Sequence, residues 1–338
     1  QADALDARLK NKSGSPGSLF GAVVSLKDNI CYAGHRVTAA SKILEGFISQ
    51  YSATAVERIL AEDAIIIGRT NCDQFGMGSS NENSAYGPVR NAADPARVPG
   101  GSSGGAAVAV QTDSCLVALG SDTGGSIRQP AAFCGVWGFK PTYGRISRHG
   151  LIAYGSSFDQ IGFMGNNPDD IARFLEVCAG PDGFDGTVVE SGGQRAEGGG
   201  LRVGWFPEVF EHPGMDAGVR DVLLNFIEKL KTAGHTVESA TLPKLGEGNE
   251  TILDYLVPAY YVLTTAEASS NLARYDGIRY GYRSPDAKNL EETYLLSRTG
   301  GFSEEVKRRI LLGTFVLSSG YYDAYYRKAQ QLRRIIQE

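Results

Sequence analysis

The sequence predicts an α/β protein in which helices cover both faces of a mixed or parallel central sheet, followed by a largely helical C-terminal part. Two observations lead to this fold class. Short apolar runs alternate with segments of helical spacing in the first half of the chain, and residues from 251 onward follow helical patterns. Such alternation is typical of sheets whose strands are joined by helices. The chain has 338 residues, which is long enough to bury a large hydrophobic core.

The first half of the chain supplies most of the predicted strands. An apolar run at 23–26 ends in the polar residues Lys27, Asp28 and Asn29, which indicates a buried strand with polar groups at its carboxyl end. Helical spacing and β-branched runs then predict, in order, a helix at 53–62, a strand at 64–68, a polar loop at 71–99, a helix of small residues at 106–111, a strand at 115–119, a loop at 120–125 and a helix that opens at Ser126.

The second half begins with a strong helix-start signal. Asn167 is a capping residue, and Pro168 and two acids follow it, which predicts a helix through 171–177. The remaining predicted elements are a Gly-rich linker at 181–200, a strand at 201–206, a helix at 216–232, a strand at 236–242, and helices from 251 that end in one helix at 321–338. We expect residues 1–338 to form a single domain. The last helix has no Gly, Asn or Pro stop signal, so we also expect this domain to lack a C-terminal portion.

Charge and hydropathy exclude two classes of protein. The chain carries 33 Lys and Arg against 38 Asp and Glu, a net charge of −5 without a basic run, which argues against a free-standing nucleic-acid binder. The apolar stretches at 64–67 and 106–110 are far shorter than the roughly 20 residues that span a bilayer. The start of the chain shows no charged-then-apolar leader, so we expect a cytoplasmic protein without a membrane segment.

Cysteine and histidine spacing gives no support to a metal site. The five cysteines are an odd number and form no CxxC pair, so we expect them to be buried small hydrophobic residues in a reducing compartment. The four histidines have no ligand spacing. Neither metal catalysis nor a Ser-His-Asp triad is supported.

Glycine is the most informative residue type. Of the 43 glycines, seven fall between positions 100 and 125, in two clusters that each precede a predicted helix and carry serines. Helix starts after Gly-rich loops bind phosphates, yet neither cluster matches the established nucleotide-binding patterns. A purely structural interpretation, in which the clusters are tight turns with capping serines, stays open at this level.

Acyl transfer is a third interpretation of the same clusters. It needs a nucleophile, a base and donors to the developing oxyanion. Ser126 follows Gly124 and Gly125, which leave consecutive backbone N–H groups unobstructed. Because no histidine is suitably spaced, the base would be a lysine kept neutral by burial, and Lys27 at the end of an apolar strand fits that role.

Three segments resemble the amidase signature family: PGGSSGG at 99–105, GSDTGGSIRQPAAFCG at 120–135 and GFKPT at 138–142. The separations between positions 27, 102 and 126, of 75 and 24 residues, also match that family. The resemblance implies a mixed central sheet, with Ser126 as the acyl-forming nucleophile, Ser102 as a bridging serine after a cis peptide bond, and Lys27 as the base. It further implies that an oxyanion hole is formed by the backbone N–H groups of Thr123, Gly124, Gly125 and Ser126.

Neighbouring residues leave some assignments open. Ser103 is a rival for the bridging role, and only its spacing from Lys27 argues against it. Asp122 and Arg128 flank the nucleophile, and we expect them to form a structural ion pair that holds the turn. Lys140 is expected to belong to the scaffold.

Two C-terminal segments, at 260–282 and 305–326, resemble the A subunits of glutamyl/aspartyl-tRNA amidotransferases within this family. The resemblance implies a glutaminase that passes ammonia to a B subunit, which uses ATP and Mg to amidate mischarged Glu-tRNA(Gln) or Asp-tRNA(Asn), with a C subunit bracing the pair. No cofactor is expected in this chain, and tRNA would be held by the B subunit. Arg309 is the candidate for the glutamine carboxylate and Tyr260 for a hydroxyl contact.

Alternatives remain for the protein and for its substrate residues. Arg309 lies in a run of three basic residues, which also suits a solvated helix face. In a second interpretation, the chain is a stand-alone amidase for small or aryl amides. In a third, it would be a non-catalytic docking fragment, because members of this family continue well beyond a helix such as 321–338.

Overall fold

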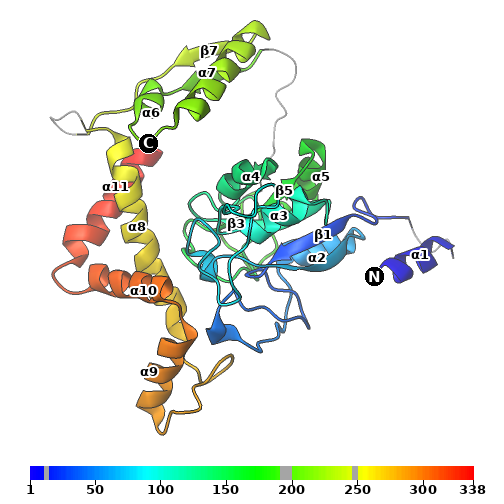
Figure 1. Cartoon of the computed structure of the whole chain (residues 1–338), viewed down its shortest axis with the longest axis vertical. Coiled ribbons are helices and arrows are strands. Elements are labelled where there is room, and N and C mark those ends of the chain that lie inside the picture. The colour runs from blue at the N-terminus through cyan, green and yellow to red at the C-terminus, as the bar shows by residue number, and fades with distance from the viewer. Residues whose placement is uncertain (11–14, 191–199, 246–249) are drawn as a thin grey trace. The chain divides into compact units, whose positions relative to one another are not determined.

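The computed structural model describes residues 1–10, 15–190, 200–245 and 250–338 (Figure 1). The chain divides into two compact units. The first comprises Gln1–Ser191 and Leu263–Tyr322, and the second comprises Gly192–Val262 and Asp323–Glu338. The predicted linker at 181–200 falls at this division, and its residues 191–199 lie outside the described residues. A single domain over 1–338 stays a prediction.

The first unit contains a five-stranded sheet. Its strand order is β2 (Ile65–Thr70), β1 (Val23–Lys27), β3 (Val117–Asp122), β5 (Gln160–Gly165) and β4 (Trp137–Phe139). Strand β1 is parallel to both of its neighbours, whereas β5 is antiparallel to β3 and β4. The prediction of a mixed central sheet is therefore confirmed.

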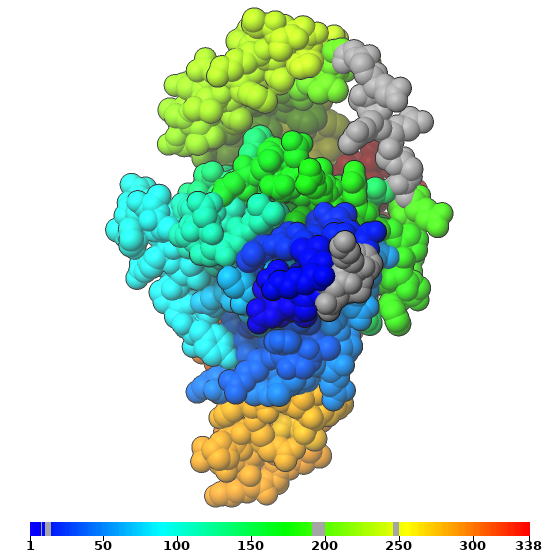
Figure 2. Space-filling view, turned by 90° about the vertical axis from the view of Figure 1, so that its right-hand side faces the viewer, coloured from blue at the N-terminus to red at the C-terminus, as the bar shows by residue number. Residues whose placement is uncertain are grey.

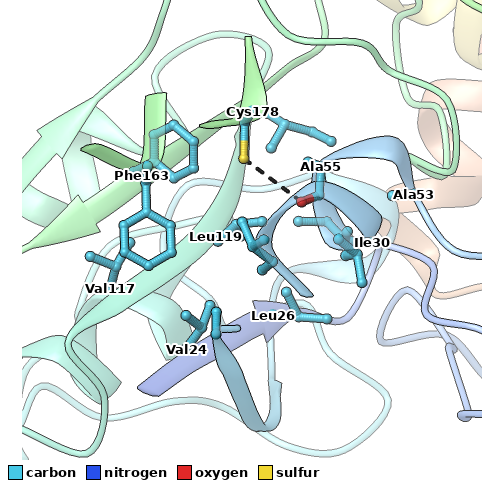
Figure 3. Packing of buried hydrophobic residues seen from close by; sticks show 14 of the residues in the cluster. Val24, Leu26, Ile30, Ala53, Ala55, Val117, Leu119, Phe163 and Cys178 are labelled. Atoms are coloured by element: carbon cyan, nitrogen blue, oxygen red, sulfur yellow. Dashed lines mark hydrogen bonds between the residues drawn. The ribbon is translucent and has the colours of Figure 1, made fainter. Parts of the chain in front are cut away.

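Helices cover both faces of this sheet because strand residues alternate between two hydrophobic clusters. One face packs against α2 (Thr54–Ala61) and α5 (Pro168–Cys178), and the other packs against α3 (Gly104–Gln111) and α4 (Arg128–Cys134). The first cluster, drawn in Figure 3, receives from the strands Val24, Leu26, Val117, Leu119, Ile161 and Phe163. The second cluster receives Ala118 and Met164. The predicted cover on both faces is confirmed.

All five cysteines are buried and free, as the sequence predicted. Figure 3 shows one of them at the edge of the first cluster, where the Cys178 thiol donates to the Ala55 carbonyl at 3.7 Å. Over the described parts of the chain, no group of three or more His, Cys, Asp or Glu is arranged to hold a metal ion. The helices described there are all too short or too polar to cross a bilayer.

The other regular elements of the first unit are helices, joined by long loops. The predicted cap is present, since the Asn167 side chain accepts from the Asp169 amide at 2.9 Å at the start of α5. Helix α1 lies on the surface, at the dark blue end of the chain in Figure 2. The elements of this unit not yet named are α1 (Ala2–Lys10), η1 (Lys42–Leu44), η2 (Gln74–Gly76), the second part of α8 (Ile252–Asn271), η3 (Leu272–Arg274), α9 (Leu290–Gly301) and α10 (Glu304–Leu317).

The second unit has two parallel strands, β6 (Arg202–Trp205) and β7 (Thr236–Ser239). Strand β7 is shorter than the predicted strand at 236–242 because β6, its partner, ends where Trp205 pairs with Ser239. The other elements of this unit are α6 (Pro207–Glu211), α7 (Ala217–Thr232), the first part of α8, most of η4 (Tyr322–Arg327) and α11 (Lys328–Gln337). The predicted helix at 321–338 therefore begins with a π-helical segment, η4.

Candidate active site

The residues predicted to carry chemistry meet at one edge of the central sheet. Lys27 is the last residue of β1, and Ser121 and Asp122 end the neighbouring parallel strand β3. The carboxyl ends of parallel strands point to the same edge, where α/β proteins commonly bind ligands. Ser102 lies just before α3 and reaches the same edge through its contact with Lys27.

Lys27 is fully buried at this edge and contacts two serines. Its Nζ donates to Ser102 Oγ at 2.7 Å, to Ser121 Oγ at 2.8 Å and to the Ser121 carbonyl at 3.4 Å. The Asn29 side chain also donates to Ser121 Oγ, at 2.9 Å. Ser121 was not singled out in the sequence, although it stands inside the second Gly-rich cluster.

The environment of Lys27 favours a neutral amine. Burial lowers its pKa below the usual range, while more distant negative groups, Asp73 and Asp122 among them, act in the opposite direction. Within the described residues, no carboxylate oxygen lies within ion-pair distance of its Nζ. A lowered pKa makes the neutral amine easier to reach, and a neutral lysine is able to act as a general base.

The two serines of the first Gly-rich cluster, Ser102 and Ser103, have different partners. The Gly101–Ser102 peptide bond is cis, as the resemblance implied. Ser102 Oγ faces Lys27, whereas Ser103 Oγ donates to the Ser121 carbonyl at 3.1 Å. The structure thus brings Ser102, not its rival Ser103, to the lysine. Gly101 is required by close packing, since a Cβ there would lie 2.2 Å from Asp73 Oδ2.

Ser126 is hydrogen-bonded through its backbone to the first Gly-rich cluster. Its carbonyl accepts from the Ser103 amide at 3.1 Å, and its side chain is largely buried. The prediction that a helix opens at Ser126 is wrong, because α4 begins at Arg128. The Asp122 carboxylate accepts from the amides of Gly125 at 2.8 Å, Ile127 at 3.1 Å and Arg128 at 3.4 Å, which holds the preceding residues in a turn.

Asp122 and Arg128 form the predicted ion pair, with Nη2 and Oδ1 3.0 Å apart. Burial acts to raise the pKa of Asp122, but the Arg128 guanidinium and the turn amides outweigh it and hold that pKa below its usual range. The amide of Gly125 is engaged by this carboxylate. The four predicted oxyanion donors are therefore not equivalent, and the amides of Thr123, Gly124 and Ser126 are the stronger candidates.

The sequence interpretation missed Asp159, which immediately precedes β5. Thr123 Oγ1 donates to Asp159 Oδ1 at 2.6 Å, so the candidate oxyanion loop is held by a second carboxylate. Asp159 is buried, and burial raises its pKa to about 6. A single aspartate before an apolar run carries no motif, and only strand pairing brings it to Thr123.

Arg309 is buried rather than solvated, so the solvated-face alternative is wrong: the residue is only 8% exposed. Its Nε donates to Glu305 Oε1 at 2.8 Å and its Nη1 donates to the Tyr154 hydroxyl at 2.9 Å. Burial opposes the charged form, but Tyr154 and Glu305 outweigh it and raise the pKa of Arg309 above its ordinary value. Tyr154 was not predicted as a site residue.

Two further residues, Tyr260 and Lys140, were assigned roles from the sequence. Tyr260 belongs to the second unit, where its ring packs edge-on against Tyr261 with centroids 5.7 Å apart, and its substrate contact stays a prediction. Lys140 donates to the carbonyl of Pro141 at 2.6 Å, and its scaffold role likewise stays a prediction.

Comparisons with known proteins give a consistent set of relatives. Residues 1–338 match the family model described as Amidase. The A subunit of the glutamyl-tRNA(Gln) amidotransferase from Chlorobaculum parvum is 55% identical over 345 residues, which cover 100% of this chain and 70% of the relative. The protein of the same name from Chlorobium luteolum is 54% identical over 345 residues, covering 100% of this chain and 69% of the relative.

Solved structures agree with the sequence relatives. The A subunit of the glutamyl-tRNA(Gln) amidotransferase from Thermotoga maritima is 40% identical and has a TM-score of 0.76, with 95% of this chain covered. The native peptide amidase from Stenotrophomonas maltophilia is 27% identical with a TM-score of 0.76, and 97% of this chain is covered. The chain spans 65% of the length of the Thermotoga protein and 67% of the Stenotrophomonas enzyme.

Proposed function

The chain belongs to the amidase family, and from this premise we propose that it is the glutaminase subunit of a tRNA-dependent amidotransferase. Relatives named as A subunits of glutamyl-tRNA(Gln) amidotransferases, at 51 to 55% identity, support this choice within the family. The reaction would release ammonia from the side-chain amide of glutamine and leave glutamate.

One observation supports the chemistry above all others. A buried lysine lies 2.7 Å from the hydroxyl of Ser102, and burial lowers the pKa of its amine. The Ser103 amide in turn holds the backbone of Ser126. This arrangement suits a proton relay from a serine nucleophile through a second serine to a neutral lysine.

In the proposed mechanism, neutral Lys27 accepts the proton of Ser102 Oγ as Ser102 accepts the proton of Ser126 Oγ. Ser126 Oγ attacks the amide carbon, and backbone N–H groups of the loop that contains Thr123 and Gly124 stabilise the oxyanion. The carbon–nitrogen bond then breaks, the relay returns its proton to the leaving nitrogen, and ammonia departs. Water attacks the acyl group, which releases glutamate and restores Ser126.

Arg309 is the proposed anchor for the α-carboxylate of glutamine. Its guanidinium is charged at any physiological pH and forms a partly buried ion pair with Glu305, at 2.8 Å. The predicted hydroxyl contact from Tyr260 is part of this proposal. A permanent cation at one end of the site and a neutral base at the other suit an amino-acid amide better than a simple amide.

The rest of the proposal concerns partners. Ammonia would pass to a B subunit that binds tRNA and uses ATP and Mg to amidate Glu-tRNA(Gln) or Asp-tRNA(Asn), with a C subunit completing a heterotrimer. This chain would hold no cofactor of its own and would work in the cytoplasm. Its net charge of −5 supports the division of labour, because the partner would supply the basic surface for tRNA.

The test is ammonia release from glutamine by the complete enzyme. The wild type and Ser126→Ala are compared with and without the B subunit, ATP and mischarged tRNA. We expect the wild-type rate to rise when these are added, and Ser126→Ala to lose the activity. An electrophile that labels serine nucleophiles of amidases should attach to wild-type Ser126 and not to Ser126→Ala.

Two results would replace the proposal. High activity on simple amides that ignores B subunit, ATP and tRNA would identify a stand-alone amidase, an activity of the kind that the peptide amidase relative carries in its name. If the complete wild-type enzyme neither releases ammonia nor takes the label, the chain is a docking fragment. Lys27→Ala provides a second check, because it removes the base while leaving Ser126 in place.

A further inference from the structure

Asp159 lies beside the candidate oxyanion loop as a result of strand register. In the antiparallel pair of β3 and β5, Asp122 is opposite Gln160. The residues just beyond this pair, Thr123 on one strand and Asp159 on the other, are therefore neighbours. Thr123 Oγ1 donates to Asp159 Oδ1 at 2.6 Å, a short bond between a hydroxyl and a carboxylate.

The carboxylate of Asp159 also organises a second segment. Its Oδ2 accepts from the Tyr154 amide at 2.9 Å, and its Oδ1 accepts from the Gly155 amide at 3.2 Å. The backbone between them is a tight turn, in which the Asp159 amide donates to the Gly155 carbonyl at 2.8 Å. One buried side chain thus fixes both Thr123 and the start of the segment at Tyr154.

Tyr154 carries the connection to the other end of the site. Its hydroxyl accepts from Arg309 Nη1 at 2.9 Å and donates to Thr264 Oγ1 at 3.0 Å. The Arg309 guanidinium carbon lies 5.6 Å from the centroid of the Tyr154 ring. Tyr154 is only 2% exposed, so the position of its ring follows directly from the position of its backbone.

The same segment is fastened to α8 within the first unit. The amide of Ser157 donates to Glu267 Oε2 at 2.9 Å, and the Asn271 side chain donates to the Tyr154 carbonyl at 3.1 Å. These bonds would hold the segment against the helix without Asp159. They do not reach Thr123, so Asp159 has a connecting role that its neighbours do not share.

From these contacts we propose that Asp159 is a positioning residue that sets the oxyanion loop, through Thr123, and the substrate-binding guanidinium, through Tyr154 and Arg309, in one fixed relation. The inference rests on the proposed glutaminase function. It assigns to Asp159, a carboxylate outside the Lys27, Ser102 and Ser126 set, the role of fixing the distance between the oxyanion loop and the Arg309 guanidinium. That distance would determine the length of substrate that the site accepts.

The chemistry of Asp159 supports a functional role for the carboxylate. Its three hydrogen-bond donors among the described residues are all uncharged: one hydroxyl and two backbone amides. A buried carboxylate without a cationic hydrogen-bond partner destabilises the fold. An asparagine would avoid that penalty but would direct an amide N–H₂ at one of the donors. A carboxylate is needed only if all three donors must be held together.

The test uses the complete enzyme and two substrates, glutamine and propionamide, because propionamide lacks the α-carboxylate that Arg309 would bind. We expect Asp159→Asn to lower kcat about tenfold for both substrates, because the oxyanion loop would be misplaced. It should raise KM about tenfold for glutamine alone, because only glutamine has the carboxylate that a misplaced Arg309 would bind less well. Thr123→Val should reproduce the kcat effect and Tyr154→Phe the KM effect. Asp276→Asn, at another buried aspartate in a turn, is the matched control.

Two results would overturn the inference. One is an Asp159→Asn enzyme whose kcat and KM match those of Asp276→Asn. The other is a loss of kcat for both substrates that equals the loss of Ser126 labelling by the electrophile. That result would indicate that a fraction of the variant is misfolded and that the rest is fully active. A wild type that hydrolyses propionamide and not glutamine would remove the glutaminase proposal, while the kcat of Asp159→Asn on propionamide would still decide the Thr123 part.

Discussion

Two buried cations of the first unit, Lys27 and Arg309, have opposite surroundings. Lys27 is fully buried, and its amine contacts serine hydroxyls and a carbonyl. Arg309 is nearly as buried, but its guanidinium pairs with the carboxylate of Glu305 and with the hydroxyl of Tyr154. One cation is thus left with neutral partners, and the other is matched by an anion.

This difference moves the two pKa values in opposite directions. Burial lowers the pKa of Lys27, whereas Glu305 and Tyr154 outweigh burial at Arg309 and raise its pKa. A buried cation without a counter-ion becomes a base, and one with a counter-ion keeps its charge and is suited to bind an anion. Burial alone therefore does not identify the role of a cation, and its partners do.

The largest expected effect comes from removing the base. Lys27→Met should lower kcat for glutamine by roughly 1,000-fold, within the range for general base catalysis, because Ser102 loses its proton acceptor. The fold should be as stable as the wild type or more so, because the methionine needs no desolvation of an amine. Ammonia release and thermal unfolding measure the two effects, with Lys140→Met as the control. A variant that keeps more than a tenth of the activity would contradict the assigned role.

The two adjacent serines provide the next test. Ser102→Ala should lower kcat by roughly 100-fold, since it breaks the relay between Ser126 and Lys27. Ser103→Ala removes only a hydroxyl that donates to the Ser121 carbonyl, so its kcat should stay within about tenfold of the wild type. Single-turnover rates of ammonia release decide between them. The reverse order would give the bridging role to Ser103.

At the other cation, the expected effect is on substrate binding. Arg309→Lys should raise KM for glutamine by roughly 30-fold, because a lysine cannot reproduce the planar contacts to Glu305 and the substrate carboxylate. Its KM for propionamide should not change. Arg308→Lys, at a neighbouring residue that is 71% exposed, is the control. Equal effects on both substrates would show that Arg309 supports the fold and does not bind the carboxylate.

The smallest expected effect is a pH dependence of stability. Burial raises the pKa of Asp159 to about 6 in the folded state, so the folded state binds a proton more tightly than the unfolded state. Asp159 therefore adds stability as pH falls from 7 to 5, by about 1 kcal/mol, and this gain is lost as pH rises through 6.

Denaturant unfolding of the wild type and Asp159→Asn at pH 5 and pH 7 measures this contribution. The charged groups that face Asp159, namely Lys27, Arg148 and Glu267, are present in both proteins, so the difference reports Asp159 together with its electrostatic coupling to them. If the two proteins have the same pH dependence, Asp159 is not a buried carboxylate with a raised pKa.

The sequence was sufficient to predict which residues of continuous segments lie together at the candidate site. Lys27, Ser102 and Ser126 were predicted because a strand end and two Gly-rich clusters carry their motifs, and their catalytic roles stay predictions. The sheet followed from the alternation of strands and helices, and the family resemblance specified that it is mixed. The start of α4 was predicted two residues too early, because the pattern of residues does not reveal that the Asp122 side chain takes three backbone amides. Such local competition for hydrogen bonds decides where helices begin.

Asp159 and Tyr154 could not be predicted in the same way. Asp159 reaches Thr123 through strand pairing across 36 positions, and Tyr154 reaches Arg309 across 155. Neither contact leaves a local spacing in the sequence. Arg309 itself was ambiguous, since a run of basic residues suits both a solvated face and a binding site. Its burial against Tyr154 rules out the solvated face, and its binding role stays a proposal.

The five buried cysteines are natural probes of local unfolding, because a thiol reagent reaches them only when the fold opens. Thiols react as thiolates, and burial raises the pKa of Cys134 to about 11 and those of Cys72 and Cys178 to about 12, so a thiol reagent should modify the closed fold very slowly. Each modification event would then report a moment of exposure. Cys72 adjoins the loop around Asp73, and Cys178 ends α5 in the hydrophobic core. Comparing the labelling rates of these two thiols would show whether the candidate site or the core unfolds locally more often.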